Sequence, residues 1–140
     1  MPTQTAAQRR ADAARAYDAF LAQCPTRQLL DRLADKWVAL VLAALREHHE
    51  PMRFSQLARK IASISQKMLT QTLRALERDG LVTRTVTPTV PVRVDYELTP
   101  LGRDLTAVMV QLKTWAEAHM DEVQAARAAY DETAERAVAA

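Results

Sequence analysis

Apolar residues recur every three or four positions along most of the chain, and every second position in one short segment. The first period predicts helices from residue 100 onward and at about residues 6–23, 25–33, 36–47, 55–61 and 65–79. The second period covers residues 81–87 and 92–98, where β-branched residues alternate with others. A stiff tip with a proline at each end, Pro88–Pro91, joins the two strands expected there. The pattern therefore predicts a mainly α protein of the α+β class.

One predicted helix, at about residues 65–79, has two chemically different faces. The face that must be buried is apolar and consists of Met68, Leu69, Leu73 and Leu76. The opposite face consists of Gln66, Lys67, Thr70, Gln71, Arg74 and Arg78. Such side chains reach phosphates and base edges, so this face predicts a DNA recognition helix. Ser65 is expected to cap the helix, and Gly80 to end it in the left-handed conformation.

The segments around this helix predict a winged helix-turn-helix. A helix capped by Ser55 precedes it, and a tight turn at residues 62–64 connects the two. The hairpin at about residues 81–98 follows directly, as a wing does. A two-stranded hairpin is marginal alone, so we expect it to lie on the helices and to pair with a short strand at residues 52–54. The DNA-binding domain is therefore expected at residues 24–99.

The two ends of the chain predict dimerisation helices. Residues 1–23 contain an Ala-rich helix with too little apolar surface to be held in place alone. A long helix begins after Thr99-Pro100 and is expected at residues 100–125, with a coiled-coil-like seam of Leu101, Leu105, Val108, Leu112, Trp115 and His119. Packing within one chain would also produce this seam, but we favour a homodimer formed by both terminal helices. Residues 126–140 are expected to be a tail that frays beyond about Tyr130.

Composition and charge narrow the function classes. The 140 residues contain no run of about 18 apolar positions, so no membrane helix is expected, and the polar start lacks the apolar centre of a signal peptide. Between Arg59 and Arg84 there are six basic and two acidic residues, whereas from Glu117 onward there are two basic and six acidic ones. The positive segment contains the candidate recognition helix, as expected for contact with a polyanion, although random surface charge is an alternative. The single cysteine, Cys24, fits a reducing cytoplasm.

An enzyme is not expected from this sequence. Two glycines provide no Gly-rich phosphate loop. His48, His49, His119 and Cys24 do not show the spacings of common metal sites, so we expect neither a metal nor a cofactor. A winged helix used only for protein contacts is a further alternative, but it would be expected to lack the basic helix.

In these features the chain resembles the HxlR family of winged helix-turn-helix transcriptional regulators, in the MarR-like superfamily. The resemblance runs in unbroken order from about Cys24 to His119. It is carried by Cys24-Pro25, Asp35-Lys36-Trp37, Arg53–Leu57, Ile64–Gln71, Leu76–Val82, Arg84–Val86, Pro88, Val90-Pro91, Arg93-Val94, Tyr96–Thr99 and Leu101-Gly102. It implies a dimeric, DNA-binding regulator from a bacterium or archaeon, with a MarR-type regulator as the nearest alternative.

The chain departs from the family pattern at two places. Gln66 stands where the family often has proline, which loses rigidity but adds a side chain that can contact DNA. Ala34-Asp35 replaces a common Gly-Gly, which changes the expected turn and not the expected fold.

The candidate DNA-contacting residues are polar and lie on the recognition helix or in the wing. They are Ser65, Gln66, Lys67, Thr70, Gln71, Arg74, Arg84 and Arg93. The helix residues are assigned to the major groove, where Gln pairs with adenine and Arg with guanine, while Lys67 and Thr70 position on phosphates. The wing arginines are expected to reach the DNA backbone or the minor groove. A dimer would read an inverted repeat, as a repressor; a merely solvated face is the alternative for each residue.

Two ways of switching the regulator stay open. Cys24 is expected at a helix N-terminus near Arg27, which favours the reactive thiolate. The resemblance adds weight, because several HxlR relatives sense oxidants or electrophiles through a cysteine at this place. An intersubunit disulfide, a mixed disulfide or alkylation is then expected, and a half-buried packing residue is the alternative. The second candidate is a small apolar ligand in a pocket lined by Tyr17, Phe20, Trp37 and Trp115, residues that would equally serve as plain core.

Overall fold

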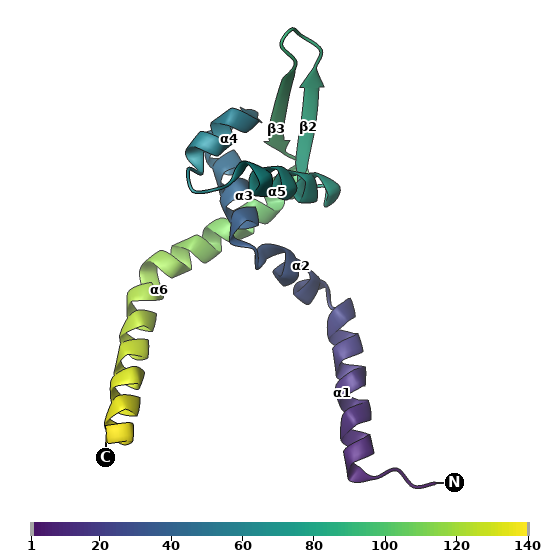
Figure 1. The fold of residues 1–140 in the computed structure, drawn as a ribbon, viewed down its shortest axis with the longest axis vertical. Helices are drawn as coiled ribbons and strands as arrows, with labels where there is room; N and C mark the ends of the chain where they lie inside the picture. The colour runs from purple at the N-terminus through teal and green to yellow at the C-terminus, as the bar shows by residue number, and fades with distance from the viewer. Residues whose placement is uncertain (1, 140) are drawn as a thin grey trace.

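Two helical arms extend from one body that contains the buried residues of the chain (Figure 1). The protein is described here by a computed structural model, which covers residues 2–139. One arm consists of α1 (Ala6–Gln23) and α2 (Pro25–Leu33), and the other is the outer part of α6 (Pro100–Ala139). The body contains the start of α6, helices α3 (Lys36–His48), α4 (Phe54–Lys60) and α5 (Gln66–Arg78), and strands β1 (Met52–Arg53), β2 (Val82–Thr87) and β3 (Arg93–Leu98).

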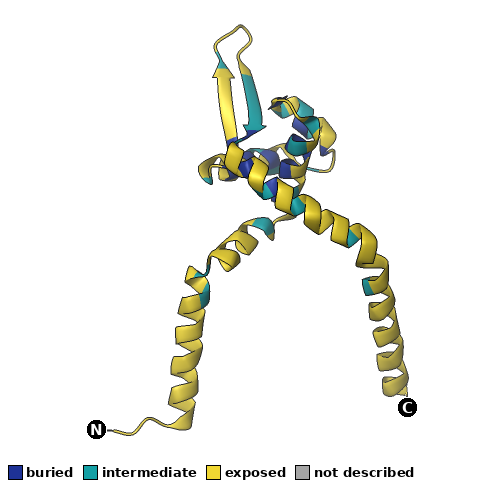
Figure 2. Cartoon of the chain, turned by 180° about the vertical axis from the view of Figure 1, so that it is seen from behind, coloured by how far each residue is buried: buried dark blue, intermediate teal, exposed yellow. Residues whose placement is uncertain are grey.

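The hydrophobic core lies between the three short helices and the base of the sheet (Figure 2). Its most deeply buried aliphatic side chains are Val41 and Leu42 of α3, Leu57 of α4, and Leu69, Leu73 and Leu76 of α5. Burial of one such side chain stabilises the fold by about 1.5–3 kcal/mol. The apolar stripe predicted for residues 65–79 is therefore the surface that fixes α5 on the body, which leaves its other face exposed.

The three strands form one antiparallel sheet in the order β1-β3-β2. Met52 lies opposite Tyr96, so the predicted pairing of this segment with the hairpin is confirmed. The strand is shorter than expected, because Phe54 already begins α4. The side-chain oxygen of Gln56 accepts a 2.8 Å hydrogen bond from the backbone N–H of Arg53, and Arg53 is the N-cap. The expectation that Ser55 caps this helix is therefore wrong.

Three helix ends are fixed by local chemistry, and those at Ser65 and Gly80 confirm the sequence predictions. Asp35 caps α3 through a 2.8 Å hydrogen bond from the backbone N–H of Trp37. Ser65 caps α5 in the same way, with the N–H of Met68 as donor at 3.1 Å. Gly80 follows α5 with a φ of +74°, the left-handed conformation that glycine adopts at little cost. These caps satisfy backbone groups that the helices leave unpaired.

The first turns of α6 are packed on the body. Gly102 and Thr106 are buried, and Leu105 and Met109 pack against the core. Arg46 of α3 donates a 3.0 Å hydrogen bond to Oγ1 of Thr106. The start of α6 is thus fixed to α3, and its direction of exit from the body is set by these contacts.

Beyond those turns both arms are exposed. α1 and α2 contain no buried residue. Where a separate tail was expected at residues 126–140, residues 126–139 instead continue α6 as one helix, and residue 140 lies outside the described residues. Alanine and glutamate are strong helix formers, and Arg136 pairs with Glu132 one turn earlier. The overall architecture is the predicted winged helix-turn-helix with additional terminal helices.

Candidate nucleic-acid interface

Helix α5 presents a polar face to solvent. Lys67, Gln71 and Arg74 are exposed along this face, and Gln66 is exposed at its first turn. None of them forms an ion pair or a side-chain hydrogen bond within residues 2–139. Four side chains with hydrogen-bonding groups are thus free on a rigid helix. Such groups are needed to contact DNA phosphates and to read the edges of the bases.

Thr70 differs from its neighbours on this face. Its hydroxyl donates a 2.9 Å hydrogen bond to the backbone carbonyl of Gln66, and the residue is half-buried. The hydroxyl oxygen can still accept a hydrogen bond, but its donor is occupied. A phosphate needs donors, so Thr70 is a weaker candidate for phosphate binding than Lys67.

The wing and α5 share a groove of about 330 Å³. Thr70, Arg74 and Glu77 line it from the helix, and Arg84 and Tyr96 from the wing. Arg84 lies directly opposite Tyr96 in the hairpin, on the side of the wing that faces α5. Two predicted arginines, Arg74 and Arg84, are therefore brought to one surface. Tyr96 was not predicted as a site residue.

Arg93 is not brought to this surface. Arg93 pairs with Thr87, which lies an odd number of positions along β2 from Arg84. Its side chain therefore points to the other face of the hairpin. There its Nε lies 2.9 Å from Oδ2 of Asp95. This local ion pair leaves Arg93 less available to DNA than Arg84.

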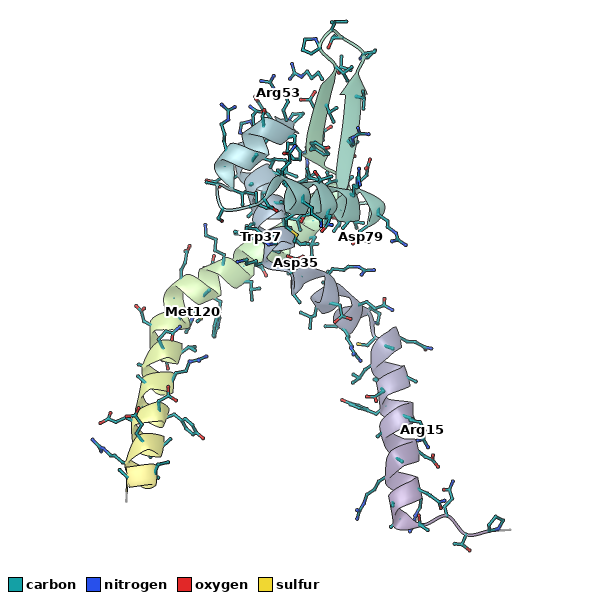
Figure 3. The ribbon with its side chains drawn as sticks, viewed as in Figure 1. Arg15, Asp35, Trp37, Arg53, Asp79 and Met120 are labelled. Carbon is teal, nitrogen blue, oxygen red and sulfur yellow. The ribbon has the colours of Figure 1, made fainter. Side chains whose placement is uncertain are left out.

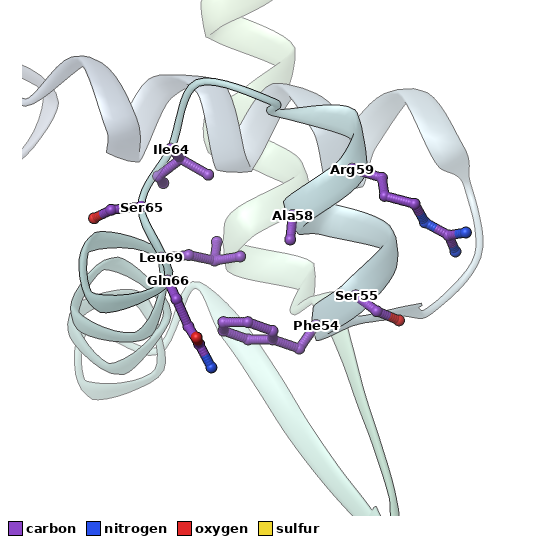
Figure 4. Close-up of a pocket in the computed structure, with 8 residues that line it drawn as sticks. All are labelled: Phe54, Ser55, Ala58, Arg59, Ile64, Ser65, Gln66 and Leu69. Atoms are coloured by element: carbon purple, nitrogen blue, oxygen red, sulfur yellow. The ribbon is translucent and has the colours of Figure 1, made fainter.

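A hollow of about 500 Å³ lies at the turn between α4 and α5, the two helices of the helix-turn-helix (Figure 4). Gln66 and Phe54 point toward the same end of it, whereas Ser65 and Arg59 point outward. Arg59 was counted in the positive segment but not predicted as a contact. In a helix-turn-helix the first helix crosses the DNA backbone, so exposed Arg59 belongs with the candidate phosphate contacts.

Cys24 lies between α1 and α2 and is half-buried. It precedes Pro25, the first residue of α2. The backbone N–H groups of Arg27 and Thr26 lower the pKa of the Cys24 thiol below its ordinary value, because they stabilise the thiolate at the start of the helix. The thiol is thus placed at the junction between the two helices of one exposed arm.

The four aromatic residues predicted to line a ligand pocket are not gathered within one chain. Tyr17 and Phe20 are exposed on α1, whereas Trp37 packs against the core beside Asp35 (Figure 3). Trp115 is exposed on α6, where its ring stacks on His119 with 4.7 Å between ring centroids.

A different apolar cavity, of about 600 Å³, lies between α3 and α6. Its walls include Leu33, Leu40, Met109 and Leu112. It contains none of the four aromatic residues.

Two further observations bear on function. No helix within residues 2–139 is both long enough and apolar enough to span a membrane. In the same part of the chain, no three His, Cys, Asp or Glu side chains are grouped so that they would hold a metal ion.

Comparison with known proteins gives one consistent result. The family model of the HxlR-like helix-turn-helix matches residues 32–124. The HTH-type transcriptional regulator YtfH of Escherichia coli is 45% identical over 108 residues, which cover 77% of this chain and 84% of that protein.

Solved structures agree. The structure of YtfH from Salmonella typhimurium shares 42% identity with a TM-score of 0.65, over 77% of this chain and 95% of that one. The reduced form of the transcriptional regulator YodB from Bacillus subtilis shares 36% identity with a TM-score of 0.61, over 69% and 94%.

The fold, the exposed face of α5 and these matches agree with one another. The matched residues 32–124 include the whole helix-turn-helix, the wing and the start of the last helix. The relatives bear the names of transcriptional regulators and not of enzymes. This chain belongs to the HxlR family and is a transcriptional regulator with a helix-turn-helix DNA-binding domain.

Proposed function

We propose that this protein is a homodimeric repressor of the cytoplasm that binds an inverted-repeat operator and is released when Cys24 is oxidised or alkylated. The observation that carries the DNA-binding part is the exposed polar face of α5, which continues through Arg74 into Arg84 of the wing. Gln66, Gln71 and Arg74 read base edges in the major groove. Lys67 and the backbone N–H of Ser65 bind phosphates.

Unpartnered apolar side chains on both arms support a dimer. Leu112 and Trp115 of α6 are more than half exposed, as are Tyr17 and Phe20 of α1. Isolated helices gain little stability from propensity alone, so these faces need a partner. A second copy is the partner that supplies the same two helices.

The charges of the arms favour contact between α1 of one copy and α6 of the other. From Glu117 onward α6 carries six acidic and two basic residues, so pairing two such segments would place like charges together. In α1, Arg9 and Arg10 flank the face of Tyr17, whereas Arg15 is paired with Asp12 on the opposite side. A two-fold dimer would place two α5 helices about 34 Å apart, the spacing of successive major grooves.

The position of Cys24 supports a redox switch. A lowered pKa increases the thiolate fraction, and the thiolate is the form that reacts. With one cysteine in each chain, the products are an intersubunit disulfide, a mixed disulfide or an alkylated thiol. Because Cys24 joins α1 to α2, a bulky or cross-linked product changes the direction of α1 and hence the spacing of the two recognition helices. The relative YodB has been solved both in a reduced form and after treatment with diamide, a thiol oxidant.

A small apolar ligand is the second candidate for the switch. The cavity between α3 and α6 favours it, because its lining is mostly apolar and its size suits a small molecule. Tyr17, Phe20, Trp37 and Trp115 would contribute only if the second copy brings them together. The MarR-type alternative is set aside, since the HxlR-like family model matches residues 32–124.

One experiment tests the proposal. The purified protein selects duplexes from a random library, with and without diamide, and the same is done with Cys24→Ser. We expect an inverted repeat to be recovered, diamide to release the wild type, and the variant to stay bound. Failure to select any sequence would refute the operator, and equal release of the Cys24→Ser variant would refute the thiol switch.

A further inference from the structure

The tip of the wing exposes apolar side chains. Val90 is fully exposed, and Val92 and Val86 are 64% and 47% exposed. Pro88 and Pro91 frame the turn. No part of the described chain covers these side chains, although they end a hairpin that projects away from both arms (Figure 1).

This tip is held in a defined shape. The hydroxyl of Thr89 donates a 2.8 Å hydrogen bond to the carbonyl of Pro91, and the N–H of Thr89 donates to the carbonyl of Thr87, also at 2.8 Å. The two prolines restrict the backbone further. A preformed loop loses little entropy on binding, so even a small contact there contributes to affinity.

The tip is continuous with the proposed DNA-binding surface. Val86 and Val94 lie opposite each other, on the same face of the hairpin as Arg84 and Tyr96. Six paired residues at about 3.3 Å each place the tip roughly 20 Å from the strand ends that are buried in the core. The major groove is about 12 Å wide, so the wing is long enough to extend from a major groove that holds α5 to the next minor groove.

The outer wing offers little charge for phosphates. Arg93 is the only basic residue between residues 85 and 98, and it is paired with Asp95. A contact made by this tip is therefore apolar and does not neutralise phosphates.

We propose that, when the wing lies in the minor groove, Val90 at its tip disfavours G·C pairs at the contacted position. The inference rests on the proposed binding of DNA by α5. In the minor groove only guanine presents an amino donor, N2, and a valine cannot accept its hydrogen bond. An A·T pair lacks that donor and leaves the groove floor free for the isopropyl group.

The test compares Val90→Ser with Val138→Ser, the same change at an exposed position on the far end of α6. The probe is a duplex that the wild type selects from random sequence, with flanks made of G·C or of inosine·cytosine pairs. These pairs have the same major-groove edge, but inosine lacks the N2 amino group. Affinity is measured over a series of salt concentrations.

We expect the wild type to prefer the inosine flanks several-fold, and Val90→Ser to bind them roughly 5–10-fold more weakly with an unchanged salt slope. Val138→Ser should match the wild type. The inference would be overturned if Val90→Ser kept the affinity of the wild type. It would also be overturned if this variant had a salt slope reduced by about 1, or if it kept the preference for inosine flanks. If the wild type selects no duplex at all, the proposed function fails instead.

Discussion

The hydroxyl of Thr99 joins the end of the recognition helix to the start of α6. It donates a 2.6 Å hydrogen bond to the carbonyl of Gly80, and it accepts a 3.0 Å hydrogen bond from the backbone N–H of Gly102. The N–H of Thr99 donates to the carbonyl of Leu81 at 3.0 Å. The proposed dimer arm and the proposed DNA-reading helix therefore meet at one residue.

Thr99→Val removes this hydroxyl with little change in shape. We expect it to lower the free energy of unfolding by about 1–2 kcal/mol, since a helix cap and the hydrogen bond to the Gly80 carbonyl are lost. Urea unfolding at one fixed protein concentration measures the change. Thr133→Val is the control, because the Thr133 hydroxyl only bonds its own helix on an exposed surface. Equal effects of the two changes would show that Thr99 has no special role.

The two glycines are required for different reasons. A Cβ at Gly102 would lie 2.2 Å from the carbonyl oxygen of Leu81, so backbone must shift. A Cβ at Gly80 would meet nothing within 4 Å, but the φ of +74° disfavours it. We expect Gly102→Ala to destabilise the protein by about 3 kcal/mol and Gly80→Ala by only about 1 kcal/mol. Thermal unfolding of both variants checks the order, and the reverse order would contradict the packing of α6 on Leu81.

The reactivity of Cys24 should depend on pH in a defined direction. The pKa of the thiol is lowered, so alkylation by iodoacetamide should reach half its maximal rate at a lower pH than for a cysteine-containing unfolded peptide in the same buffer. The largest cause is the backbone N–H of Arg27 and not its charge. Arg27→Pro removes that N–H and should raise the midpoint.

Arg27→Gln is the matched control for that measurement. It keeps the backbone N–H and should move the midpoint little. A wild-type midpoint equal to that of the peptide would contradict the role of the helix start. If the midpoint of alkylation rose strongly in Arg27→Gln and not in Arg27→Pro, the guanidinium group would be the cause of the lowered pKa.

The dimer proposal predicts a difference between two faces of the outer α6. At 100° per residue, Ala126 lies in line with Leu112 and Tyr130, whereas Ala128 lies on the opposite side. Ala126→Glu should weaken self-association at least tenfold, and Ala128→Glu should change it less than twofold, as measured by sedimentation equilibrium. The same residue is replaced in the same helix, so helix propensity cancels. Equal effects of the two changes would argue against the face with Leu112, Ala126 and Tyr130 as the interface.

Much of the fold was predictable because local signals agreed with one another. Asp35, Ser65 and Gly80 mark helix ends by chemistry that acts within a few residues, and the stripe around Leu69 and Leu73 indicates which face of α5 is buried. The start of α4 was misplaced because Ser55 is a better cap by type than Arg53. The helix begins at Phe54 because Gln56 accepts a hydrogen bond from the N–H of Arg53 and because Phe54 packs against the core. A sequence pattern contains neither contact.

The candidate site was predicted less evenly. The exposed residues of α5 follow from helical periodicity, but the meeting of Arg74 with Arg84 depends on how the hairpin lies on the helix. The different placement of Arg84 and Arg93 depends on strand register, and the ion pair of Arg93 with Asp95 depends on rotamers. The extent of α6 was underestimated, since composition alone does not separate a frayed tail from an alanine-rich helix.

The binding of DNA by the polar face of α5 is tested most directly with single alanine variants on a selected duplex over a range of salt. We expect Arg74→Ala to weaken specific binding by about 1–3 kcal/mol and to relax the preference at one base pair, and Lys67→Ala to lower the salt slope by about 1 for any sequence. Arg127→Ala, on the outer α6, should bind as the wild type does. Unchanged affinity of both α5 variants at matched salt would contradict the account.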